Sequence, residues 1–289
     1  MAEQQQQQIA ERPRSKAPYE VSDELRPRVD ELGLSDAIDG LREDGYAVIH
    51  DAAPPELLDE MREAIHSLVA QTPQTPDSKE SVPMLLGRHP AIDRVATLPK
   101  VLALAEFSVG KAVRAGRFHG SIMRQGQGPE TGGLHSDQNW IPTPFPEHNL
   151  MVTFCFACEG MTDEGGATRV VPRSHLERRH PTEEESADAK SVAIEVEKGA
   201  VAVWDGAVWH GSGHRTIGGT RTVLHATYQR LYTQPINDFT YLLADAGYMA
   251  AAPEGIRGLL GADLFFGTDT ATTDIDMEKF IRTTTASKL

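Results

Sequence analysis

Residues 199–213 read GAVAVWDGAVWHGSG, and this stretch says most about the fold. Its first half alternates small and β-branched residues, as a strand does, and the glycines that follow predict a turn that presents His210. Similar short runs occur throughout the chain after about residue 113, and turns containing Gly or Pro separate them. These runs are RFHGSIM, NLMVTFCFA, ATRVV, SVAIEVE and RTVLHATYQRLY. Many short strands with such punctuation predict a mainly β sandwich or barrel.

The part of the chain before this β-rich region has a helical pattern. Residues 36–71 predict a helix, a strand at YAVIH and a second helix that begins near Pro54 and Pro55. Residues 99–113 predict a further helix. The polar stretches TPQTPDSKESVP and ERRHPTEEESADAK are expected to be loops, the second of them at the surface. Together these patterns predict helices that flank a β-rich core.

Composition narrows the class of protein. The chain has 289 residues, 28 Lys and Arg, 42 Asp and Glu, and a formal net charge of −14. No dense basic block is present, so binding to nucleic acid is not expected. The acidic balance also argues mildly against a highly anionic substrate, although a basic pocket can lie inside an acidic chain. No apolar run approaches the roughly 20 residues of a membrane helix, and no membrane association is expected.

The two ends of the chain suggest little folded structure of their own. Residues 1–20 are Gln-rich and then rich in Pro and charge, which predicts a disordered tail. The start lacks the pattern of a secretory signal. With only two cysteines and no disulfide framework, a reducing cytoplasm is the expected location. Residues 246–289 mix Gly and Ala with scattered apolar residues and are interpreted as a cap or an interface, with a homodimer as one option.

The two cysteines form a C-x-x-C motif, Cys155 and Cys158, within a predicted strand. Positions three apart on a strand point to opposite faces, so the pair is not expected to chelate one metal or to form a disulfide readily.

The stretch GGLHSDQNWIP carries the first chemical signal. His135 and Asp137 are two apart, so an extended backbone projects both side chains from one face. With His210 as a third ligand they would form the two-His, one-carboxylate facial triad of non-haem Fe(II) oxygenases. The H-x-D pair alone is weak evidence, because a chain with 11 His contains such pairs by chance.

Arg221 strengthens the assignment. It lies 11 positions after His210, at the start of the predicted strand RTVLHATYQ. A 2-oxoglutarate co-substrate that chelates iron through its keto-acid end needs an anchor for its far carboxylate, and a guanidinium pairs with a carboxylate through two hydrogen bonds. An ordinary ion pair at the strand edge is the alternative interpretation of Arg221.

The sequence resembles the phytanoyl-CoA dioxygenase family of Fe(II)/2-oxoglutarate-dependent oxygenases from about Leu41 to Tyr232. The resemblance rests on LREDGYAVIHDAAPPELLDEM, HSD, GGATRVVPRSH, WDGAVWHGSG and the later TRT. It departs from the family pattern at Arg173, where the family usually has Gly, and at His214, where Asn is common. The resemblance implies a double-stranded β-helix, a jelly-roll (cupin-like) barrel with helices outside, and it makes residues 21–289 a single domain.

The resemblance also implies roles for individual residues. His135, Asp137 and His210 would be the iron ligands and carry the catalysis, and Arg221 would bind 2-oxoglutarate with help from Ser212. Thr153 and Cys155 share a strand face and are further candidates for the co-substrate, with packing in the barrel as the alternative. Related halogenases lack the carboxylate ligand, so Asp137 favours hydroxylation or another oxidation. Residues near the ligands are weaker candidates for substrate contacts: Gln138, Asn139, Trp140 and His225.

The expected function is therefore a dioxygenase that uses Fe(II), 2-oxoglutarate and O2 to hydroxylate an unactivated C–H bond of a small molecule, such as a lipid-like acid or a secondary metabolite. A non-catalytic jelly-roll that binds a metal or ligand is the alternative, and Arg221 distinguishes the two, because a metal store needs no buried anchor for a dicarboxylate. A zinc hydrolase ranks last, because no general base is evident beside the triad.

Overall fold

The computed structural model describes residues 19–75, 79–130, 132–188 and 190–262. Its strands are β1 (Tyr46–Ile49), β2 (Glu80–Val82), β3 (Arg114–Arg124), β4 (Met151–Ala157), β5 (Thr168–Val170), β6 (Val192–Ala193), β7 (Val201–Asp205), β8 (His210–Ser212) and β9 (Thr220–Gln229). Its α-helices are α2 (Arg26–Leu32), α3 (Ser35–Glu43), α4 (Pro55–Ala70), α5 (Pro90–Ala96), α6 (Pro99–Val109), α7 (Glu183–Asp188), α8 (Ala246–Ala251) and α9 (Ile256–Leu259). Nearly all of the predicted disordered tail lies outside the described residues.

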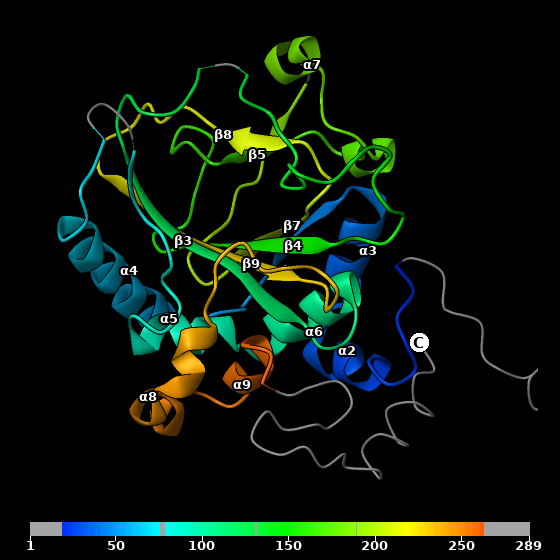
Figure 1. The fold of residues 1–289 in the computed structure, drawn as a ribbon. Helices are drawn as coiled ribbons and strands as arrows, with labels where there is room; N and C mark the ends of the chain where they lie inside the picture. The colour runs from blue at the N-terminus through cyan, green and yellow to red at the C-terminus, as the bar shows by residue number, and fades with distance from the viewer. Residues whose placement is uncertain (1–18, 76–78, 131, 189, 263–289) are drawn as a thin grey trace, which may run out of the picture.

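Two antiparallel sheets form the jelly-roll. The larger sheet has the order β1-β7-β4-β9-β3-β2, and the smaller has the order β6-β5-β8. In Figure 1 the small sheet lies above the large one, and helices α4, α5 and α6 lie on the other side of the large sheet. The predicted fold, a mainly β jelly-roll with helices outside it, is confirmed.

Side chains along the central strands point alternately to the two faces of the large sheet, and they therefore belong to two separate cores. On β4, Phe154 and Phe156 pack toward the helices, whereas Cys155 and Ala157 belong to the core between the two sheets. The inter-sheet core consists largely of small or β-branched side chains such as Ala202. Because adjacent strand residues face opposite sides, one strand can fill the helical core with aromatic rings and still leave space between the sheets.

Two stretches predicted as loops contain regular structure. TPQTPDSKESVP includes β2, which pairs with β3 at the edge of the large sheet. ERRHPTEEESADAK includes helix α7, whose start is a capping box. There the Glu185 N–H donates to Thr182 Oγ1 at 3.2 Å, and the Thr182 N–H donates to Glu185 Oε2 at 2.8 Å. These reciprocal bonds satisfy two backbone donors and allow a short acidic helix to form.

The described part of the C-terminal segment packs beside the outer helices. Helix α8 and the start of α5 line one pocket, and α9 contacts β3. The segment therefore packs on the helical side of the molecule as far as residue 262. Its role as a cap or an interface stays a prediction, and residues 263–289 lie outside the described residues. Within the described ranges, no helix has the length and apolarity to span a bilayer.

Candidate active site

The three predicted metal ligands converge at one end of the small sheet. His135 and His210 pair through two backbone hydrogen bonds of 2.9 Å, although 75 residues separate them in the sequence. The ligand atoms of these two histidines and of Asp137 all lie within 4.8 Å of one another. The His210 Nε2 to Asp137 Oδ1 distance is 3.7 Å. Three such donors, with room left for further ligands, fit a divalent metal of the non-haem iron type.

Hydrogen bonds to backbone carbonyls set the tautomers of His135 and His210. His135 Nδ1 lies 3.2 Å from the Gly133 carbonyl, and His210 Nδ1 lies 3.1 Å from the Val208 carbonyl. Because a carbonyl only accepts, each Nδ1 carries a proton, so the neutral form of each ring has its lone pair on Nε2, where it can bind a metal. Burial lowers the pKa of His210, which favours the neutral form that can bind a metal.

Asp137 is held as a carboxylate. Burial would raise its pKa, but nearby His210 and His135, together with hydrogen bonds from Thr153 and Trp204, bring it below the ordinary value. The Thr153 hydroxyl donates to Asp137 Oδ2 at 2.9 Å, and the Trp204 indole N–H donates to the same oxygen at 3.3 Å. Oδ1 is the oxygen that faces His210.

A cavity of about 190 Å³ opens beside the triad. Both sheets line it, with Lys79, Arg117, His119, His135, Asp137, Thr153, Thr168, Trp204, His210, Gly211, Ser212, His225 and Thr227. The sequence predicted Thr153, Ser212 and His225 at this position, and all three line the cavity. It missed Lys79, which follows a polar loop, and Arg117 and His119, which alternate on β3. The strand RFHGSIM, with polar residues two apart on one face, is the signal that points to Arg117 and His119.

Gln138, Asn139 and Trp140 do not line this cavity. Gln138 is 1% exposed and lies inside the fold, whereas the Trp140 side chain is 75% exposed at the surface. The chain bends directly after Asp137, and the Ile141 N–H donates to the Gln138 carbonyl in a turn. Closeness to the metal ligands in sequence therefore does not carry these side chains into the cavity.

Arg221 is buried and is not among the residues that line the cavity, although its charge acts on Lys79, which does line it. Its side chain is 1% exposed, its Nη1 donates to the Gly166 carbonyl, and its Nε has no hydrogen-bond partner. No carboxylate in the described residues forms an ion pair with it. Lys79 Nζ lies 3.5 Å from Ser212 Oγ, and burial together with the charge of Arg221 lowers the pKa of Lys79. A buried guanidinium without a carboxylate partner suits an anionic ligand.

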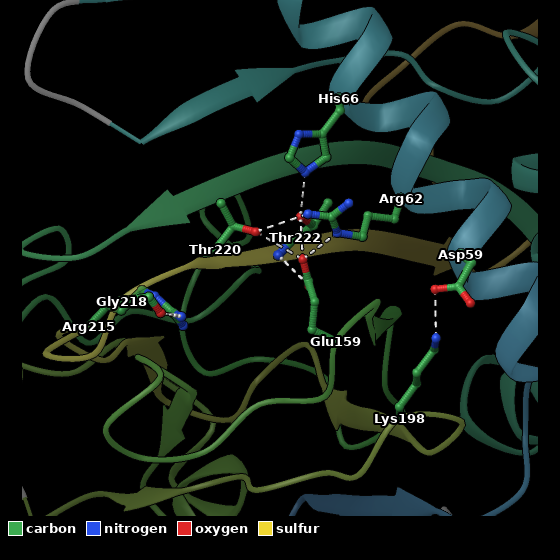
Figure 2. A network of polar contacts seen from close by, with 9 residues as sticks. All are labelled: Asp59, Arg62, His66, Glu159, Lys198, Arg215, Gly218, Thr220 and Thr222. Atoms are coloured by element: carbon green, nitrogen blue, oxygen red, sulfur yellow. Dashed lines mark hydrogen bonds and ion pairs between the residues drawn. The ribbon is translucent and has the colours of Figure 1, made fainter.

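A polar network on the outer face of β9 fixes the strand that carries Arg221 (Figure 2). The Glu159 carboxylate accepts hydrogen bonds from the Thr222 N–H at 2.8 Å and from the Thr222 hydroxyl at 2.9 Å. It also accepts from Arg62 of α4 at 2.8 Å, and His66 Nε2 lies 2.9 Å from Thr222 Oγ1. The network ties α4, the end of β4 and β9 together at the residue next to Arg221.

The two cysteines lie on β4 and directly after it, and both are buried free thiols. Cys155 belongs to the inter-sheet core and Cys158 to the helical core, so they face opposite sides as predicted.

A jelly-roll with a His-Asp-His cluster at its open cavity defines a class of mononuclear metal proteins. The sequence model of the phytanoyl-CoA dioxygenase (PhyH) family matches residues 41–223, and the chain belongs to this family. This match confirms the resemblance stated from the sequence.

Among curated relatives, dioxygenase af480 of Aspergillus fumigatus is 28% identical over 72% of this chain and 71% of its own length. Dioxygenase olcK of Penicillium canescens is 26% identical over 70% and 72%. Solved structures share the fold. HygX from Streptomyces hygroscopicus, with nickel and 2-oxoglutarate bound, has a TM-score of 0.57 and 18% identity over 70% of this chain and 88% of its own. The epimerase SnoN from nogalamycin biosynthesis has a TM-score of 0.58 and 19% identity over 73% and 87%.

Proposed function

We propose that the protein is an Fe(II)- and 2-oxoglutarate-dependent dioxygenase that hydroxylates an unactivated C–H bond of a small organic molecule. The observation that carries the proposal is the pairing of the His135, Asp137 and His210 cluster with Arg221, a buried cation that has no carboxylate partner in the described residues. A protein that only stored a metal would have no use for this arginine. The dioxygenase relatives and the nickel- and 2-oxoglutarate-bound state of HygX support the same assignment.

The residues present fit both groups. His135 Nε2, His210 Nε2 and a carboxylate oxygen of Asp137 would hold the metal on one side and leave its other positions for 2-oxoglutarate and O2. Arg221 and Ser212 would hold the far carboxylate of 2-oxoglutarate, and Lys79 lies beside Ser212 to add a second positive charge. Thr153 contacts Asp137 directly, so it orients the metal ligand, a role distinct from the predicted contact with the co-substrate.

When bound, Fe(II), 2-oxoglutarate and O2 supply an oxidant for C–H bonds, while 2-oxoglutarate is decarboxylated to succinate and CO2. The protein contributes position and exclusion of water. Hydrogen bonds from Trp204 and the Thr153 hydroxyl keep Asp137 ionised and fix its orientation. An oxidant that removes hydrogen must meet one bond of the substrate at close range, so rigid strands are a suitable support.

SnoN is an epimerase of similar fold, so product analysis decides between hydroxylation and another outcome. The first test is succinate formation by the Fe(II)-loaded protein with 2-oxoglutarate and O2. A slow rate without any substrate is expected, and Asp137→Ala should abolish it. A candidate substrate should raise the rate, and its product should contain one more oxygen atom. Succinate formation no faster than in Asp137→Ala would contradict the proposal.

A further inference from the structure

The walls of the cavity are basic, although the chain as a whole has a net charge of −14. Lys79 and Arg117 line the cavity, whereas Arg221 is buried and does not line it. Among the cavity-lining residues in the described part of the chain, Asp137 is the only carboxylate. The acidic balance of the whole sequence therefore does not describe the surface that a substrate meets.

Arg117 and Arg221 lie at different levels along the paired strands β3 and β9. On β9, Arg221 and Thr227 share one face, and their partners across the sheet on β3 are Met123 and Arg117. Six residues separate the two levels, which corresponds to about 20 Å of strand. Thr227 Oγ1 lies 3.0 Å from Thr153 Oγ1, which in turn contacts Asp137. Arg117 therefore lies at the level of the metal ligands, whereas the backbone of Arg221 lies about 20 Å from that level along the strand.

No acidic group within the described ranges neutralises Arg117. Its side chain is exposed at the cavity, and it forms no ion pair and no side-chain hydrogen bond there. The imidazoles of His119 and His225 lie between the levels of Arg117 and Arg221 and face each other across the strand pair. Burial, with help from Arg117 and Lys79, lowers the pKa of His119 to about 4, and burial with Lys79 lowers that of His225. Both rings are therefore neutral near pH 7 and supply no countercharge.

The charges of the loaded site leave Arg117 unpaired. The formal charges of a divalent metal, Asp137, the dianion 2-oxoglutarate and Arg221 sum to zero, which leaves Lys79 and Arg117 as the remaining cations of the site. Lys79 lies beside Ser212 on the co-substrate side, so Arg117 is the cation that remains on the side of the metal ligands. We propose that Arg117 binds a carboxylate of the substrate, and that the enzyme acts on small organic acids. This inference rests on the proposed function, because it assigns Arg221 to 2-oxoglutarate.

The test measures binding to a loaded but inert enzyme. Protein saturated with Ni(II) and 2-oxoglutarate is titrated calorimetrically with matched probe pairs: benzoic acid and benzamide, phenylacetic acid and its amide, and cyclohexanecarboxylic acid and its amide. Filling the co-substrate site first prevents the acids from binding to Arg221. At least one acid should bind about tenfold or more tightly than its amide, as expected for a charge-assisted contact with a guanidinium. Arg117→Gln should bind acid and amide equally.

Arg124→Gln is the matched control. Arg124 lies on the same strand, is exposed, and pairs with Glu80 away from the cavity, so this variant should keep the preference for the acid. Affinity for 2-oxoglutarate should be unchanged in Arg117→Gln. The inference is overturned if no acid binds more tightly than its amide, or if Arg117→Gln keeps the preference. Failure of 2-oxoglutarate itself to bind the Ni(II)-loaded protein is a different result, which overturns the proposed function as well.

Discussion

The Thr153 hydroxyl joins the metal cluster to the large sheet through Asp137. Its single proton is donated to Asp137 Oδ2 at 2.9 Å, so its 3.0 Å contact with Thr227 Oγ1 must be one that it accepts. The hydroxyls of Thr227 and Thr153, on two neighbouring strands, therefore fix the orientation of the Asp137 carboxylate, which lies at a bend in a loop. Outer hydrogen bonds of this kind orient metal ligands and set their basicity.

Thr153→Val keeps the volume of the side chain and removes its hydroxyl. Metal affinity should fall by about ten- to a hundredfold, the usual effect of losing such a contact. Thr227→Val removes only the outer hydroxyl and should weaken binding less. Titration of the metal-free protein with Fe(II) under anaerobic conditions, or with Ni(II), measures both. A larger loss in Thr227→Val than in Thr153→Val would contradict this order.

Arg221→Gln should separate the binding of metal from that of co-substrate. The side chain is buried and contacts no metal ligand in the structure, so Ni(II) affinity should stay within about twofold of the wild type, while 2-oxoglutarate affinity should fall by about a hundredfold or more. Calorimetry with the Ni(II)-loaded protein gives the second value. Arg169→Gln, at an arginine that pairs with Asp163 outside the cavity, is the control. Equal losses of both affinities would show that Arg221 supports the fold and not the co-substrate.

The metal cluster could be predicted from the sequence because short local motifs, taken together with Arg221 and the family resemblance, mark its members. H-x-D places two ligands on one side of an extended segment, and a Gly-rich turn presents His210. Lys79 has no comparable signal. It lies 56 residues before His135 in a polar stretch, and only the packing of that segment against the cavity brings it beside Ser212. Contacts that depend on long-range packing leave no periodic pattern in the sequence.

Short helices such as α5 were also not predicted, because they carry no clear periodic pattern. Helix α5 has only seven residues, too few for a clear apolar period, and a local cap starts it: His89 Nδ1 accepts from the Ala91 N–H at 3.2 Å, with Pro90 in the first turn. The position of Trp140 outside the cavity has another cause. The prediction relied on the closeness of Trp140 to His135 and Asp137 in the sequence, and a bend that the sequence does not mark directs the chain away.

Acidification should destabilise the metal-free protein through His119. Its pKa in the folded state is lowered to about 4, whereas an unfolded histidine has a pKa of about 6.5. Between these values the unfolded chain takes up a proton that the folded chain does not, so stability falls as the pH drops from about 6.5 to about 4. Urea unfolding at several pH values gives the free energy of unfolding, which should fall less steeply with decreasing pH in His119→Gln than in the wild type. His148→Gln, at an exposed histidine, should keep the wild-type dependence. The prediction would be contradicted if the free energy of unfolding of His119→Gln fell with decreasing pH as steeply as that of the wild type.

Glu159→Gln should weaken the attachment of β9 to α4. The two Glu159 oxygens receive the Thr222 N–H, the hydroxyls of Thr220 and Thr222, and the Arg62 guanidinium, and a glutamine would set an amide N–H₂ against some of these donors. The free energy of unfolding should fall by about 1–3 kcal/mol, the usual cost of leaving such partners unmet.

Asp59→Asn is the matched control, because the Asp59 ion pair with Lys198 is exposed on the same side of the molecule (Figure 2) and should contribute less than about 1 kcal/mol. A second measurement separates general destabilisation from displacement of the site. Thr222 follows Arg221 directly, so Glu159→Gln should also lower 2-oxoglutarate affinity under conditions where the protein is fully folded, while Ni(II) affinity stays constant. A stability loss with unchanged 2-oxoglutarate affinity would mean that the network supports the fold without positioning Arg221.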